Sequence, residues 1–163
     1  MERGYATNPD NPTAGNIFPQ VLVEEIIPVI DKEFRTLTDR YNRAMAGFSM
    51  GGGQTFQTTL PNLDKFAYIG GLSGVGQGIT VDTVNEIYDG LFADANAFNE
   101  KVKVLFLSLG TQEGERFEQM MVTFREALDK AGIKYTYFSS RGTSHDWTTC
   151  RRSLNQFATM IFQ

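Results

Sequence analysis

Short apolar runs of strand length alternate with helical patterns along most of this chain. The run KVLFLSL, residues 103–109, is apolar at nearly every position, which is typical of a strand buried on both faces of a sheet. Similar runs lie at 43–48, 65–74 and 133–139. Because helices that join parallel strands cross over with a fixed hand, the alternation predicts an α/β fold. We expect a mostly parallel sheet of about four core strands, with helices on both faces.

The helical patterns predict where the chain packs against this sheet. Residues 18–37 repeat apolar side chains at steps of four, and Pro28 inside the segment is expected to bend the helix or remove a hydrogen bond. A second pattern over 113–131 ends at Gly132, a suitable helix stop. A third pattern over 148–162 predicts one apolar stripe, made of Leu154, Phe157, Ala158 and Ile161.

The chain is expected to form one domain, residues 1–163. Its length and its 41% of hydrophobic residues suffice for one core, and two independent domains are not expected. Residues 1–17 are rich in Pro, Gly and Asn, so we predict a loop or arm there. Residues 80–102 are predicted to be helical with a break near Gly90.

Charge and composition exclude several classes of partner. The net charge is −4 and no block of Lys or Arg is present, so neither nucleic acid nor an anionic membrane is an expected partner. No leader and no apolar run long enough to span a bilayer is found, which predicts a soluble chain without a signal peptide. With one His and one Cys, no metal site is expected, and Cys150 is interpreted as a small buried hydrophobe.

A serine stands between glycines directly after the run 43–48. Gly47-Phe48-Ser49-Met50-Gly51 matches G-x-S-x-G, the nucleophile elbow, in its expected place between a strand and a helix. The tight turn needs small residues beside the serine, and we assign Gly47 and Gly51 to that role. The amide of Met50 then points at a developing oxyanion. The alternative is a glycine-rich turn without catalysis.

A nucleophilic serine needs a base and an acid that orients it. His145 is the only histidine, and it follows the strand-like run 133–139 at the sheet edge where Ser49 lies. The acid should lie between them on a strand-end loop, which favours Glu113 over Glu115. In the alternative interpretation, both glutamates are first-turn residues whose negative charge interacts favourably with the helix dipole. The GVGQG segment, residues 74–78, is predicted to form a mobile rim of this site.

Several long segments resemble the family 1 carbohydrate esterases, which include feruloyl and acetylxylan esterases. The resemblance runs through residues 18–74, beginning FPQVLVEEIIP, and continues in LSLGTQEG and SHDW. It implies an α/β-hydrolase-like fold and a triad that carries onto Ser49, Glu113 and His145. Members of the family commonly have Asp where this chain has Glu113. Trp147 would lie beside the base, either as a packing residue or as a substrate contact.

The resemblance also sets expectations for the start of the chain. Family members have about three or four further strands before the helix near Phe18. The loop after one of these strands donates a second oxyanion amide. This chain is therefore expected to be shortened at its amino terminus, and its oxyanion hole would be incomplete unless residues 1–17 supply that donor. The strand holding Ala44 to Phe48 would become an exposed edge unless residues 1–17 or another subunit cover it, and we predict a homodimer as one way to cover it.

These features lead to two hypotheses of function. The first is a serine carboxylic-ester hydrolase without a cofactor, acting on a small ester or on feruloyl or acetyl esters of plant cell-wall polysaccharide. The resemblance would then imply secretion. The second is a shortened, catalytically weak or silent relative that acts as a binding or interaction module.

Overall fold

The computed structural model describes residues 17–163, so the loop or arm predicted over residues 1–17 lies almost wholly outside the described residues. The chain divides into two compact units, Met1–Thr38 and Asp39–Gln163. The prediction of a single domain stays a prediction, and each unit is described by itself.

The described part of the first unit contains one continuous helical segment with a widened turn, followed by non-helical residues 34–38. It comprises α1 (Phe18–Val21), the π-helical turn η1 (Leu22–Ile26) and α2 (Ile27–Glu33). In η1 the amide of Ile27 donates to the carbonyl of Leu22, five residues back. Pro28 lacks an amide hydrogen and its ring crowds the carbonyl four residues before it, so a wider turn beside it relieves the clash. The predicted disturbance at Pro28 is confirmed.

The second unit is built on a four-stranded sheet in which every pair of neighbours is parallel. The strands stand in the order of the sequence: β1 (Ala44–Phe48), β2 (Tyr68–Leu72), β3 (Val104–Gly110) and β4 (Thr136–Ser140). Their register pairs Phe48 with Leu72 and Leu72 with Ser108. The carboxyl ends of the strands therefore meet at one edge of the sheet, as the predicted site requires. This architecture confirms the predicted α/β fold.

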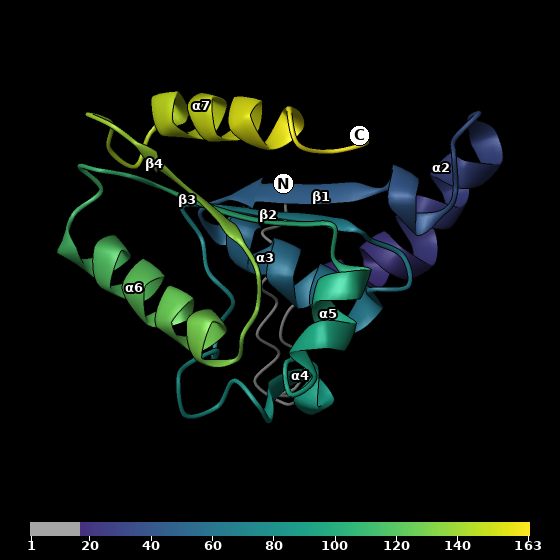
Figure 1. The fold of residues 1–163 in the computed structure, drawn as a ribbon. Helices are drawn as coiled ribbons and strands as arrows, with labels where there is room; N and C mark the ends of the chain where they lie inside the picture. Colours follow the sequence, from purple (N-terminus) through teal and green to yellow (C-terminus); the bar gives the residue numbers. More distant parts are fainter. Residues whose placement is uncertain (1–16) are drawn as a thin grey trace, which may run out of the picture. The chain divides into compact units, whose positions relative to one another are not determined.

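The helices cover both faces of the sheet, and the crossovers decide which face each one covers. Every connection moves one position in the same direction, so right-handed crossovers bring all the connecting helices to one face. Figure 1 shows the connecting helices on one side of the sheet and the last helix of the chain on the other. The connecting helices are α3 (Met50–Thr59), α4 (Ile87–Gly90), α5 (Ala95–Lys101) and α6 (Glu115–Lys130), and the last is α7 (Trp147–Ala158). Single 3-10 turns lie at Arg40–Asn42 and Leu60–Asn62.

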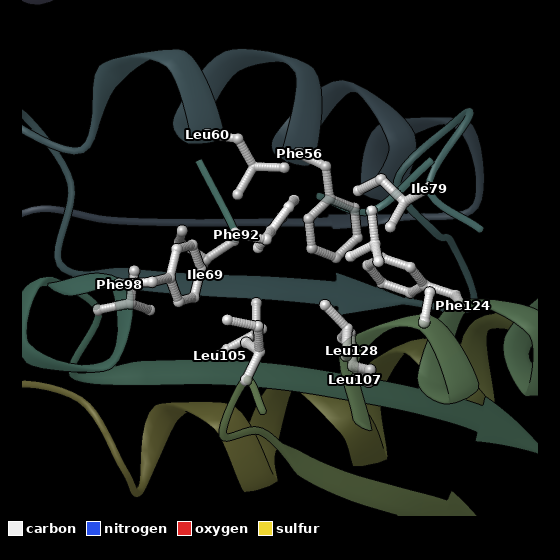
Figure 2. Packing of buried hydrophobic residues seen from close by; sticks show 14 of the residues in the cluster. Phe56, Leu60, Ile69, Ile79, Phe92, Phe98, Leu105, Leu107, Phe124 and Leu128 are labelled. Carbon is white, nitrogen blue, oxygen red and sulfur yellow. The ribbon is translucent and has the colours of Figure 1, made fainter. Parts of the chain in front are cut away.

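Alternate residues of β3 enter two separate cores. Leu105 and Leu107 belong to the larger cluster on the side of the connecting helices, whereas Phe106 belongs to the cluster under α7. Figure 2 shows the larger cluster, where Phe56 of α3 meets Phe124 of α6 edge to face, with ring centroids 5.2 Å apart. The prediction that this strand is buried on both faces is confirmed.

The apolar stripe predicted for the last helix is only partly correct, because Phe157 is buried and Ile161 packs against the same cluster, whereas Leu154 and Ala158 are exposed. Leu154 is 48% exposed and Ile161 lies beyond the end of α7. The buried face is instead small and polar, with Thr149 and Ser153 one turn apart and Phe157 after them. This helix packs close to the sheet through small side chains, so counting apolar residues alone missed the polar part of the buried face.

The helix predicted over residues 80–102 is correct only in its last part. Residues 81–86 form turns, and Tyr88, Asp89 and Gly90 have φ of 53°, 56° and 75°. Three successive left-handed residues cannot continue a right-handed helix, which confirms the break near Gly90. The chain becomes helical again at α5, where the carboxylate of Asp94 caps the first turn by accepting from the amide of Ala97.

The strand β1 lies at one edge of the sheet. In the part of the chain that the structure describes, its one strand partner is β2. Homodimer formation through this edge stays a prediction.

Candidate active site

Ser49 forms the turn between β1 and α3 in a strained backbone conformation. Its φ is 59° and its ψ −119°, values that a residue other than glycine rarely adopts. The turn is held from both sides, because the Ser49 amide donates to the carbonyl of Leu72 at 2.8 Å and its carbonyl accepts from the amide of Gly52 at 2.9 Å. The hydroxyl is thereby presented at the carboxyl end of β1.

Close backbone contacts explain some of the glycines around this turn. A Cβ added to Gly47 would lie 2.1 Å from the carbonyl oxygen of Gly51, and one added to Gly52 would lie 2.9 Å from the Cα of Gly74. At Gly51 itself, an added Cβ would meet nothing within 4 Å. The expectation that Gly51 is needed for space is therefore wrong. Gly52, one position later, faces the neighbouring loop and is the residue that must be small.

His145 lies in the segment between β4 and α7, with its ring between two phenylalanines. Its Nε2 is 2.7 Å from Ser49 Oγ. The ring stacks on Phe48 at 4.7 Å and on Phe117 of α6 at 4.3 Å between centroids. Its side chain is 28% exposed. The two flanking rings fix the plane of the imidazole and leave one edge open to solvent.

Glu113 lies in the loop between β3 and α6, and its side chain is completely buried. Its Oε2 is 2.7 Å from His145 Nδ1. Its Oε1 accepts from the hydroxyl of Ser73 at 2.5 Å and from the amide of Gly110 at 2.6 Å. Glu115 is an exposed residue at the start of α6. Of the two glutamates considered from the sequence, Glu113 is the one in contact with the histidine.

This arrangement can pass a proton from the Ser49 hydroxyl to His145, while Glu113 orients the imidazole. With Nδ1 donating to the carboxylate, Nε2 carries the lone pair that faces the Ser49 hydroxyl. The amide of Met50 opens α3, and first-turn amides have no acceptor within their own helix. That amide is available to an anionic oxygen. Residues 1–17, considered from the sequence as the source of a second donor, lie almost wholly outside the described residues.

Trp147 begins α7 and is 75% exposed. Its ring lies nearly parallel to Phe48, with centroids 6.3 Å apart. Phe48 therefore contacts both the ring of His145 and the ring of Trp147. The structure places it beside the expected base, with most of its surface facing solvent.

Sequence reasoning missed three residues of the site. Ser73 directly follows β2, has φ of 50° and is 3% exposed. Its position at a strand end on the sheet edge of Ser49 was a usable signal. Phe48 occupies the variable position of the elbow motif, and Phe117 falls within the helical pattern over 113–131. No pattern in the sequence indicates that both would enclose the histidine.

The GVGQG segment borders a pocket of about 510 Å³ beside α6. Residues 75–79 form one wall of the pocket, and Arg116, Met120 and Phe124 lie on the other. Phe117, next to Arg116, is the residue that stacks on His145. The pocket therefore borders the turn of α6 that precedes Phe117, and the prediction that the GVGQG segment forms a mobile rim of the site stays a prediction.

Other kinds of site find little support within residues 17–163. No group of His, Cys, Asp and Glu there could hold a metal ion. Desolvation raises the pKa of the half-buried Cys150, which favours the neutral thiol over the nucleophilic thiolate. Among the described helices, none combines the length and apolar character needed to cross a bilayer.

Comparison with known proteins identifies the family. The profile of the Esterase family matches residues 2–159. The endo-1,4-beta-xylanase/feruloyl esterase of Xylanibacter ruminicola is 37% identical over 147 residues. That match covers 90% of this chain and 18% of the relative, so the chain spans less than a fifth of that protein's length.

Solved structures have the same fold. The ferulic acid esterase of the anaerobic fungus Anaeromyces mucronatus matches with a TM-score of 0.73 and 24% identity, over 99% of this chain and 61% of its own. An S-formylglutathione hydrolase of Staphylococcus aureus matches with a TM-score of 0.66 and 18% identity, over 90% of this chain and 64% of its own. The resemblance to family 1 carbohydrate esterases is confirmed, and the chain belongs to the Esterase family.

Proposed function

We propose that this chain is a serine carboxylic-ester hydrolase that works through an acyl-enzyme. The observation that carries the proposal is the pair of 2.7 Å contacts that joins Ser49 Oγ to His145 and His145 to Glu113. A hydroxyl, an imidazole and a buried carboxylate in this order are the parts of a nucleophilic triad.

The mechanism follows from these contacts. Ser49 Oγ attacks the acyl carbon while His145 Nε2 takes its proton, and Glu113 stabilises the imidazolium that forms. The Met50 amide donates to the oxyanion of the tetrahedral intermediate. His145 then gives the proton to the departing alcohol, leaving an acyl group on Ser49. A water activated by the same imidazole releases the acid and restores the serine.

The substrates we propose are feruloyl or acetyl esters of plant cell-wall polysaccharide. The support is the 37% identity to a protein named as a xylanase and feruloyl esterase. A structural relative has also been solved in complex with ferulic acid. The predicted secretion of the chain would bring it to such substrates.

Hydrolysis of methyl ferulate and p-nitrophenyl acetate tests the proposal. We expect multiple turnovers of at least one ester, and the ratio of the two kcat/KM values reports the preference between feruloyl and acetyl groups. The Ser49→Ala protein at the same concentration supplies the background. Equal rates for the two proteins on both esters would favour the alternative of a binding or interaction module.

A further inference from the structure

The proposed mechanism dictates where the alcohol of the ester must lie. His145 Nε2 has to reach the leaving oxygen, so the rest of the alcohol extends past the imidazole. The helix α7 begins at Trp147, two residues after the histidine. A polysaccharide that leaves as the alcohol would therefore meet this end of α7.

Trp147 provides a flat apolar surface at that place. Although 75% exposed, its indole is held nearly parallel to Phe48, which itself stacks on His145. A large aromatic side chain that is exposed beside a candidate active site indicates a binding surface, because a ligand that covers it removes its apolar area from water. The C–H face of a pyranose ring has the shape and polarity to cover an indole.

A groove lies along α7 and begins at Thr148, the residue after this tryptophan. Arg151 lies one helical turn after Trp147, and the groove has a volume of about 360 Å³. Its walls are formed by Thr148, Arg151, Arg152 and Asn155. Arg152 is held in place by donating from its guanidinium to the carbonyl of Arg141 at 2.9 Å. Hydroxyl, amide and guanidinium groups are donors suited to sugar hydroxyls and carboxylates.

The charge of this region is opposite to that of the whole chain. Residues 141–163 contain three arginines and one acidic residue, whereas the chain carries a net charge of −4. The acidic residue, Asp146, caps α7 by accepting from the amides of Thr148 and Thr149 at 2.7 and 3.1 Å. These amide donors hold the carboxylate of Asp146 at the start of the helix. Asp146 does not line the groove, so the arginines give the groove its positive charge.

We propose that Trp147 and the groove along α7 bind the polysaccharide part of the ester, and that Arg151 pairs with the carboxylate of a uronic-acid residue on that polysaccharide. The proposal rests on the proposed function, since it specifies the alcohol that the esterase releases. It predicts a preference for acidic over neutral glycans, because a guanidinium matches a carboxylate with two parallel hydrogen bonds.

Binding without hydrolysis tests the proposal. The Ser49→Ala protein is titrated with glucuronoxylan and with an arabinoxylan that lacks uronic acid, and the affinities are measured by calorimetry. We expect tighter binding of the acidic glycan, and a difference that shrinks at high salt. Adding Trp147→Ala should weaken binding of both glycans about tenfold. Adding Arg151→Gln should weaken only the acidic glycan, by about fivefold.

Lys103→Gln is the matched control, because it removes one positive charge at the amino end of β3, away from His145. It should leave both affinities unchanged, and melting curves establish that all variants are folded. Equal affinity for the two glycans, no binding of either, or variants that bind like their parent would overturn the proposal. If methyl ferulate is still turned over by the wild type in those cases, the proposed function stands and only the glycan site is lost.

Discussion

The Glu113→Gln variant is expected to hydrolyse p-nitrophenyl acetate about 10⁴-fold more slowly than the wild type in kcat. The reason lies in the two donors at Oε1, the hydroxyl of Ser73 and the amide of Gly110. They require an oxygen at that position, so the amide nitrogen of a glutamine must face His145. An N–H group there leaves Nδ1 as the acceptor and puts the ring hydrogen on Nε2, where it can no longer take the serine proton.

Glu115→Gln is the matched control for this prediction. It makes the same chemical change two residues away, on an exposed side chain at the start of α6, and should leave kcat within about twofold. Steady-state kinetics and a thermal melt of both variants check the result. A folded Glu113→Gln protein with more than a tenth of the wild-type kcat would show that Glu113 does not select the tautomer of His145.

Gly47→Ala is expected to give the largest loss of stability among the elbow variants. The new Cβ would stand 2.1 Å from the carbonyl oxygen of Gly51, and a backbone atom cannot rotate away as a side chain can. We expect a loss of about 3 kcal/mol in the free energy of unfolding, measured in urea. A displaced serine should also lower kcat/KM by about 100-fold in the fraction that stays folded.

The control is Gly51→Ala, the other glycine of the motif. Its Cβ meets nothing within 4 Å and the residue lies in the first turn of α3, so alanine should be neutral or stabilise the protein by up to about 1 kcal/mol. Similar losses for Gly47→Ala and Gly51→Ala would contradict the packing seen at the elbow.

The sequence predicts the main part of this fold because strand and helix signals agree with each other. The run that contains Leu105, Phe106 and Leu107 can bury all its side chains only between two apolar layers. Both layers are present in the structure. The turn at Ser49 needs a strand before it and a helix after it, and both patterns are plain in the sequence. Local period and glycine placement were therefore sufficient for these elements.

Features set by close approach of distant segments could not be predicted in this way. The buried face of α7 is polar because Thr149 and Ser153 let the helix lie near the sheet, which no apolar period reveals. Gly52 is crowded by Gly74, more than twenty residues away in the chain. Ser73 reaches Glu113 only after two strands, β2 and β3, have aligned their carboxyl ends. Such contacts depend on tertiary geometry rather than on local pattern.

Covalent labelling by a fluorophosphonate, followed by intact mass and peptide mapping, tests the central claim that Ser49 is an activated nucleophile. A serine with its hydroxyl 2.7 Å from an oriented imidazole should react to one adduct per chain, located on Ser49, and the Ser49→Ala protein should remain unlabelled. An unlabelled wild-type protein, or an adduct on another residue, would contradict the account.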